Sequence, residues 1–175
     1  LSLHDALPIS SQQFYFLFLI SFLIIFLVLS AQFESFTSPI IILITVPLSL
    51  SGGLFGLWIS GSSLNIFSQI GMIILLGISA KNGILIVEFA NQLREKGMGI
   101  DEAVTESCKK RVRPVLMTVI STMIGTLPLI LGSGAGSESR ITIGIVIFFG
   151  LLTSVFLTLF ITPFFYRKIA QKINN

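Results

Sequence analysis

Long apolar runs, rather than alternating apolar and polar positions, dominate the hydrophobic pattern of this chain. The stretch from Ser35 to Ala80 carries no charge, and as one helix it would extend about 69 Å, over twice the bilayer core of about 30 Å. The turn-forming segment 60–65 divides this stretch. Strands in lipid need period-two alternation and closure into a barrel, whereas these runs are apolar on every face. The pattern therefore predicts an all-α integral membrane bundle of five transmembrane helices, at about 14–31, 38–59, 64–90, 114–131 and 141–166.

Composition supports a membrane location and excludes several functions. Of the 175 residues, 53% are hydrophobic and 11% are charged, against about 25% charged in an ordinary soluble domain. Cys108 is the only cysteine, which rules out an internal disulfide and a thiolate metal cluster. The sequence has no nucleophile–base pair, metal-binding motif or ATP-binding motif. We therefore expect a protein that is not an enzyme, uses no cofactor or metal, and draws its energy from an ion gradient.

The first ten residues differ from the rest of the chain. Segment 1–10 (LSLHDALPIS) has no initiator Met, no Lys or Arg, and no apolar core of the signal-peptide type. We expect it to be a non-native tail, which also removes His4 from any metal-binding argument. Residues 11–175 are then expected to form one transmembrane domain, as a fragment of a larger protein.

The distribution of Lys and Arg predicts the orientation of the spans. Loops 32–37 and 91–113 together with the tail 167–175 hold nine of these residues, whereas the opposite set of loops holds one. Because cytoplasmic loops are rich in positive charge, we expect loop 91–113 and the C-terminus in the cytoplasm and the N-terminal end in the periplasm. The net charge of +3 thus reflects topology and does not indicate a nucleic-acid partner.

Residues 100–112 in the basic loop predict a short amphipathic cytoplasmic helix. Apolar residues recur at helical spacing, acidic residues begin the segment, and basic residues end it, as the helix dipole favours. Such a helix fits the inner membrane interface, with Pro114 starting the next span. A solvated connector without a functional role is the alternative interpretation.

Lys81 is a charge placed well inside the third predicted span, where a lysine costs roughly 2.5–3.5 kcal/mol. Snorkelling is a weaker explanation, because the span continues about 20 Å further to Arg94. The other four predicted spans contain no carboxylate, and Glu88 lies about 10 Å along the same helix. We therefore expect Lys81 to pair with a carboxylate on a helix outside this chain.

Two further patterns concern helix faces. Arg111, Thr118, Thr122 and Gly125 are spaced by seven, four and three residues, which places them on one face of the fourth span. Small residues four apart, in segments 52–56 and 79–83, predict close helix packing.

Several segments resemble the resistance–nodulation–division (RND) superfamily, and most closely its hydrophobe/amphiphile efflux branch. They are 33–39 (FESFTSP), 77–91 (GISAKNGILIVEFAN), 111–118 (RVRPVLMT) and 134–147 (GAGSESRITIGIVI). The similarity extends over about residues 14–173 without a gap. It implies that the five spans are the last five of twelve in a multidrug efflux transporter of the bacterial inner membrane.

The resemblance also implies roles for individual residues. Lys81 corresponds to the intramembrane lysine that pairs with two aspartates of the fourth helix, and Arg111 and Thr118 correspond to the proton-pathway arginine and threonine. Asn82 and Thr122 are taken as supporting residues beside this relay. The implied mechanism is proton antiport in a homotrimer that works with a periplasmic adaptor protein and an outer-membrane channel. The missing helices and periplasmic porter domain would belong to the same protein, and the fragment alone would be inactive.

Two alternatives remain open at this point. Another RND branch, exporting metal ions or lipids, would keep the relay and change the porter domain. A structural or signalling membrane bundle would use Lys81 only for assembly.

The charge asymmetry generates a testable topology. In single-cysteine variants Gly97→Cys and Ser137→Cys, we expect an impermeant thiol reagent added to intact cells to label only position 137. Labelling at position 97 would contradict the predicted orientation.

Overall fold

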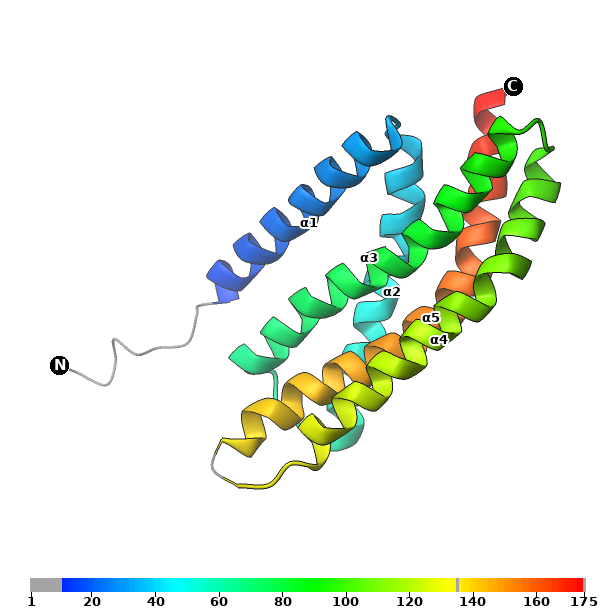
Figure 1. The fold of residues 1–175 in the computed structure, drawn as a ribbon. Coiled ribbons are helices and arrows are strands. Elements are labelled where there is room, and N and C mark those ends of the chain that lie inside the picture. Colours follow the sequence, from blue (N-terminus) through cyan, green and yellow to red (C-terminus); the bar gives the residue numbers. More distant parts are fainter. Residues whose placement is uncertain (1–10, 135, 175) are drawn as a thin grey trace.

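A computed structural model describes residues 11–134 and 136–174, which fold as a bundle of helices without a strand in this part of the chain (Figure 1). The five helices are α1 (Ser11–Phe33), α2 (Thr37–Ser60), α3 (Ile66–Glu95), α4 (Ile100–Leu131) and α5 (Ser137–Asn174). Each contains a segment long and apolar enough to cross a membrane. The predicted all-α integral membrane fold is therefore confirmed. Tail 1–10, with His4, lies outside the described residues.

The break predicted at residues 60–65 has a clear local cause. Gly61 ends α2 in the left-handed conformation, with φ 66° and ψ 15°, where a side chain would be strained. Asn65 begins α3 with a capping box. Its side-chain oxygen accepts a hydrogen bond from the Ser68 backbone N–H at 2.9 Å, and its own backbone N–H donates to the Ser68 hydroxyl at 2.9 Å. The two caps turn one long apolar stretch into two antiparallel spans.

Helix α4 differs from the expectation of a separate interfacial helix at 100–112. Those residues are helical, but they continue through Pro114 into the span as one helix. The reason lies in packing, because Ala103 and Val104 are fully buried, and Val104 belongs to a core cluster with Ala90 of α3 and Tyr166 of α5. The apolar face expected to contact lipid therefore contacts protein.

Helices α2 and α5 approach closely through the glycine pattern of segment 52–56. A Cβ atom at Gly52 would overlap the Thr153 side chain, and one at Gly56 would lie 2.6 Å from the Phe149 Cβ. No side chain fits at either position while the helices keep this spacing. The close packing predicted from the small residues is thus present in the structure.

Helices α3 and α5 run in the same direction and pack in a fixed register. A Cβ atom at Gly71 would lie 3.2 Å from the Val146 Cβ, one at Gly150 would overlap the Leu75 side chain, and Asn91 accepts a hydrogen bond from Tyr166. In each of the three pairs the α5 residue follows its α3 partner by 75 positions. The offset is the same at these three contacts, which lie near both ends of α3.

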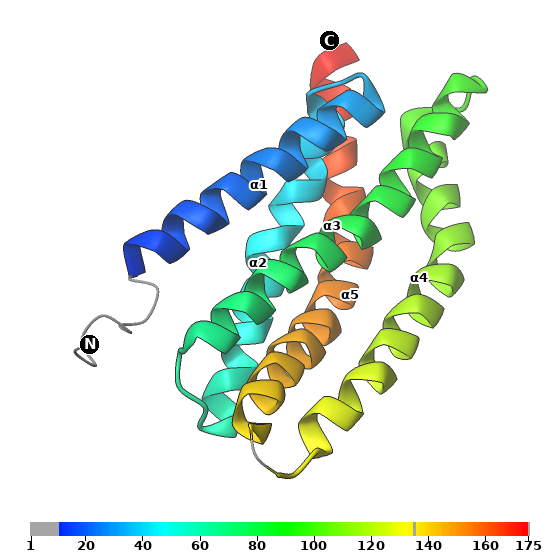
Figure 2. The same ribbon diagram turned by 60° about the vertical axis from the view of Figure 1, so that its left-hand side comes forward.

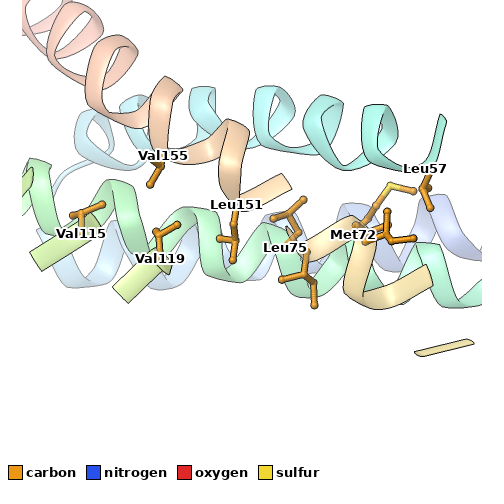
Figure 3. Packing of buried hydrophobic residues seen from close by; sticks show 10 residues of the cluster. Leu57, Met72, Leu75, Val115, Val119, Leu151 and Val155 are labelled. Atoms are coloured by element: carbon orange, nitrogen blue, oxygen red, sulfur yellow. The ribbon is translucent and has the colours of Figure 1, made fainter. Parts of the chain in front are cut away.

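The largest apolar cluster lies among α2, α3, α4 and α5 (Figure 3). Its labelled members are Leu57, Met72, Leu75, Val115, Val119, Leu151 and Val155. Helix α1 stands at the side of the bundle in both ribbon views (Figures 1 and 2) and buries only Leu29 among its described side chains. The core of the bundle is therefore made by the last four helices.

The α2–α5 contact can be tested by adding volume to it. We expect Gly56→Leu to destabilise the chain by about 1–3 kcal/mol, because the new side chain would overlap Phe149. The matched control is Gly125→Leu on α4, where nothing lies within 4 Å of the Cβ position. Unfolding in bicelles by a denaturing detergent measures both variants, and equal stability would contradict the packing described here.

Candidate functional site at Lys81 and the α4 face

Lys81 lies midway along α3, on the face that points away from the other helices. The Lys81 side chain is exposed, whereas the adjacent Ala80 and Asn82 are each 3% exposed. Among the described residues the ion pairs are Lys110–Glu106 and Arg167–Asp101, so Lys81 has no carboxylate partner there. In lipid this ammonium would be unpaired.

Asn82 points the opposite way, into the bundle. Its Nδ2 is buried and has no hydrogen-bond partner within the described part of the chain. A buried amide hydrogen without a partner costs free energy, typically about 1–3 kcal/mol. Asn82 is therefore a polar group of the interior, next in sequence to a cation on the surface.

Arg111 is held by an aromatic ring, a contact that the sequence analysis missed. The guanidinium carbon lies 4.5 Å from the centroid of the Phe89 ring on α3, a cation–π distance. Its Nε is buried without a partner among the described residues. Phe89 thus fixes the position of Arg111 while leaving hydrogen-bonding capacity on the guanidinium.

Thr118 and Thr122 lie further along α4 and use their hydroxyl protons within the helix. The Thr118 hydroxyl donates to the Val115 carbonyl at 2.9 Å, and the Thr122 hydroxyl donates to the Thr118 carbonyl at 2.8 Å. Thr118 is exposed and Thr122 is partly buried. Each hydroxyl oxygen can still accept a hydrogen bond.

The antiparallel packing of α3 and α4 brings Lys81 and Thr118 to the same depth. From the Phe89–Arg111 contact, Lys81 is eight residues back along α3 and Thr118 is seven residues onward along α4. At the helical rise both are therefore about 10–12 Å from that contact. Three of the sequence-predicted residues thus lie on neighbouring antiparallel helices: Lys81 and Thr118 at one level, and Arg111 nearer the short 96–99 turn. Figure 2 shows α3 and α4 joined by this turn.

A second polar group, also missed by the sequence analysis, joins three helices near that turn. The Tyr166 hydroxyl of α5 donates to the Asn91 side-chain oxygen of α3, and the Asn91 amide donates to the Ser38 hydroxyl of α2 at 3.1 Å. These residues line an open pocket of about 860 Å³ that also contacts Arg94 and Asp101. No spacing pattern in the sequence indicates contacts between segments this far apart.

Comparison with known proteins gives a consistent result. The model of the AcrB/AcrD/AcrF family matches residues 4–170, starting within the ten residues set aside above. An uncharacterized transporter of Haemophilus influenzae is 44% identical over 162 residues, which is 89% of this chain and 16% of the relative. Two transporters of Pseudomonas putida, the toluene efflux pump membrane transporter TtgB and the multidrug/solvent efflux pump membrane transporter MepB, are each 37% identical over 163 residues. That alignment covers 93% of this chain and 16% of each pump.

The Tyr166–Asn91 contact generates a prediction for stability. We expect Tyr166→Phe to lower the free energy of unfolding by about 1 kcal/mol, since it removes only the donor to Asn91. Tyr15→Phe is the control, because Tyr15 is 69% exposed on α1. Detergent-denaturation curves in bicelles measure both variants, and equal losses would show that the hydroxyl contact contributes nothing specific.

Proposed function

This chain belongs to the AcrB/AcrD/AcrF family, and we propose that it forms the C-terminal membrane part of a proton-driven efflux transporter for hydrophobic or amphiphilic compounds. The family match agrees with the resemblance to RND transporters found in the sequence. The chain spans 16% of the length of the relatives named above, so the activity proposed is that of a larger protein.

The unpaired Lys81 is the observation that carries this proposal. A lysine facing lipid at mid-span would cost roughly 2.5–3.5 kcal/mol, and a carboxylate on an adjacent helix removes that cost. We infer two aspartates on a helix outside this chain, facing the exposed side of α3. When ionised they hold Lys81. When they take up protons the attraction is lost and the helices can shift.

Arg111 and Thr118 extend this relay toward the 96–99 turn. The Phe89 ring holds Arg111 with an unpartnered Nε, so the guanidinium can stabilise a passing negative charge or an ordered water. Thr118 is level with Lys81 and has a free acceptor lone pair. Asn82 and Thr122 support the relay from the bundle interior and from the next turn of α4.

The proposal includes the setting of the protein. The chain lies in the bacterial inner membrane, with the N-terminal end periplasmic and the C-terminus cytoplasmic, as the positive-inside rule favours. The complete transporter is a homotrimer with a periplasmic porter domain, joined to an adaptor protein and an outer-membrane channel. The names of the two Pseudomonas putida relatives, which mention toluene, solvents and multiple drugs, favour amphiphilic substrates over metal ions or lipids. Because both aspartates lie elsewhere, the chain alone does not transport.

Removal of the Lys81 charge tests the proposal. In the complete transporter, Lys81→Met keeps the length of the side chain but leaves the aspartates without a cation, so they stay protonated over the working pH range. We expect proton-coupled dye efflux, normalised to folded trimer, to fall at least about 100-fold.

Lys109→Met is the matched control, since Lys109 is an exposed lysine on α4. Its efflux should stay within about twofold of the unmodified transporter, because exposed surface charges contribute little. Normal efflux in Lys81→Met would reject the relay and favour a structural role for this lysine, since a buried pair is often replaceable by apolar residues.

A further inference from the structure

Buried hydroxyl groups on the membrane helices fall into two classes. Most donate to a carbonyl three or four residues earlier in their own helix, as Thr45, Ser49 and Thr126 do. Ser79, Ser154, Thr158 and Thr162 are at most 1% exposed, yet their hydroxyl oxygens have no partner among the described residues. With the Asn82 amide they make five of the seven such buried atoms.

The register of α3 and α5 brings these groups together. The offset of 75 positions found for the three contacting pairs puts Ser79 at the level of Ser154 and Gly83 at the level of Thr158. Gly83 itself faces α2, because the atoms nearest a Cβ at this position belong to Ile42. Asn82 is adjacent to Gly83 and is also buried. Ser79 and Ser154 are both small, unlike the Leu75–Gly150 pair, where a large side chain fills the space left by a glycine.

The α5 hydroxyls form one row that ends at the pocket. Ser154, Thr158, Thr162 and Tyr166 are spaced four residues apart, so each lies about 6 Å from the next along the helix axis. Tyr166 bonds to Asn91, and both residues line the open pocket beside the 96–99 turn. The row therefore runs about 18 Å from the pocket to the level of Ser79.

We propose that this hydroxyl row, together with Ser79 and Asn82, binds a file of water molecules that conducts protons between the pocket and the interior beside Lys81. One water bridging two hydroxyls spans about 5.6 Å, which matches the spacing of the row. Bridging waters satisfy the buried polar atoms that the protein leaves without partners. Each water or hydroxyl accepts one proton and releases another, so no group in the row keeps a charge.

The inference rests on the proposed function for its proton source, since the protons come from the relay at Lys81. Asn82 lies at the level of Lys81 on the opposite face of α3, and its amide enters the buried row. Leu151 and Val155 each lie three residues before a hydroxyl of the row, and both belong to the apolar cluster. Apolar and hydroxyl positions close together on one helix thus supply a comparison.

Access of Ag⁺ to introduced cysteines tests for water in the row. Two variants of the full chain are prepared in membrane vesicles. Both carry Cys108→Ser; one adds Thr158→Cys and the other adds Val155→Cys. Ag⁺ binds the thiolate form of cysteine, and a thiolate forms only where water can take up the proton. Thiols that hold Ag⁺ then resist alkylation after the protein is denatured, which gives the readout. We expect Thr158→Cys to be protected at least about tenfold faster than Val155→Cys.

Val155 is a close control, since it lies three residues away on α5 and is 6% exposed. If Thr158→Cys does not accumulate, Thr162→Cys takes its place. If Ag⁺ protects the row cysteine and the control cysteine from alkylation equally slowly, the proposal is overturned. This outcome does not depend on the efflux activity of the complete transporter.

Efflux by the complete transporter then tests proton conduction. Thr158→Val removes the hydroxyl at nearly constant volume, and we expect proton-coupled efflux to fall at least about fivefold, while Thr158→Ser stays within about twofold. Equal efflux in Thr158→Val and Thr158→Ser would overturn the proposal that protons pass along the row. The two hypotheses fail in different experiments. If the proposed relay is wrong, Lys81→Met transports normally, whereas the Ag⁺ measurement still reports whether water enters the row.

Discussion

In a bilayer an apolar side chain gains little by leaving lipid for protein, so helices associate where their shapes allow close contact. Here that contact centres on α5. Gly52 and Gly56 let α2 approach it, and Gly71 and Gly150 let α3 approach it from another side. The positions of Lys81, Asn82 and the buried hydroxyls all follow from this packing, because it fixes which face of α3 turns inward. Helix α1 contributes almost nothing to it.

The sequence was sufficient for features that depend on local chemistry. The division at Gly61 and Asn65 follows from a left-handed cap and a capping box, which need only neighbouring residues. The charge of Lys81 inside a span is likewise visible in the sequence, but its pairing with a carboxylate outside this chain stays a prediction. The assignment of Lys81, Arg111 and Thr118 to a proton relay stays a prediction.

Features that depend on distant segments were not predictable. Residues 100–112 read as a membrane-surface helix because an apolar face alone does not reveal whether lipid or protein will cover it. Tyr166 and Asn91 are 75 residues apart, and their contact follows only from the register of α3 on α5. The stacking of Arg111 on Phe89 likewise requires the antiparallel pairing of two helices.

The constant offset between α3 and α5 also restricts how these helices can move. Sliding α3 by one turn would place Leu75 against Ser154 or Val146 instead of Gly150, and would separate Tyr166 from Asn91. Both steps cost packing and hydrogen-bond energy. These contacts therefore hold α3 and α5 at one relative height, so that a shift of either helix along its axis would carry the other with it.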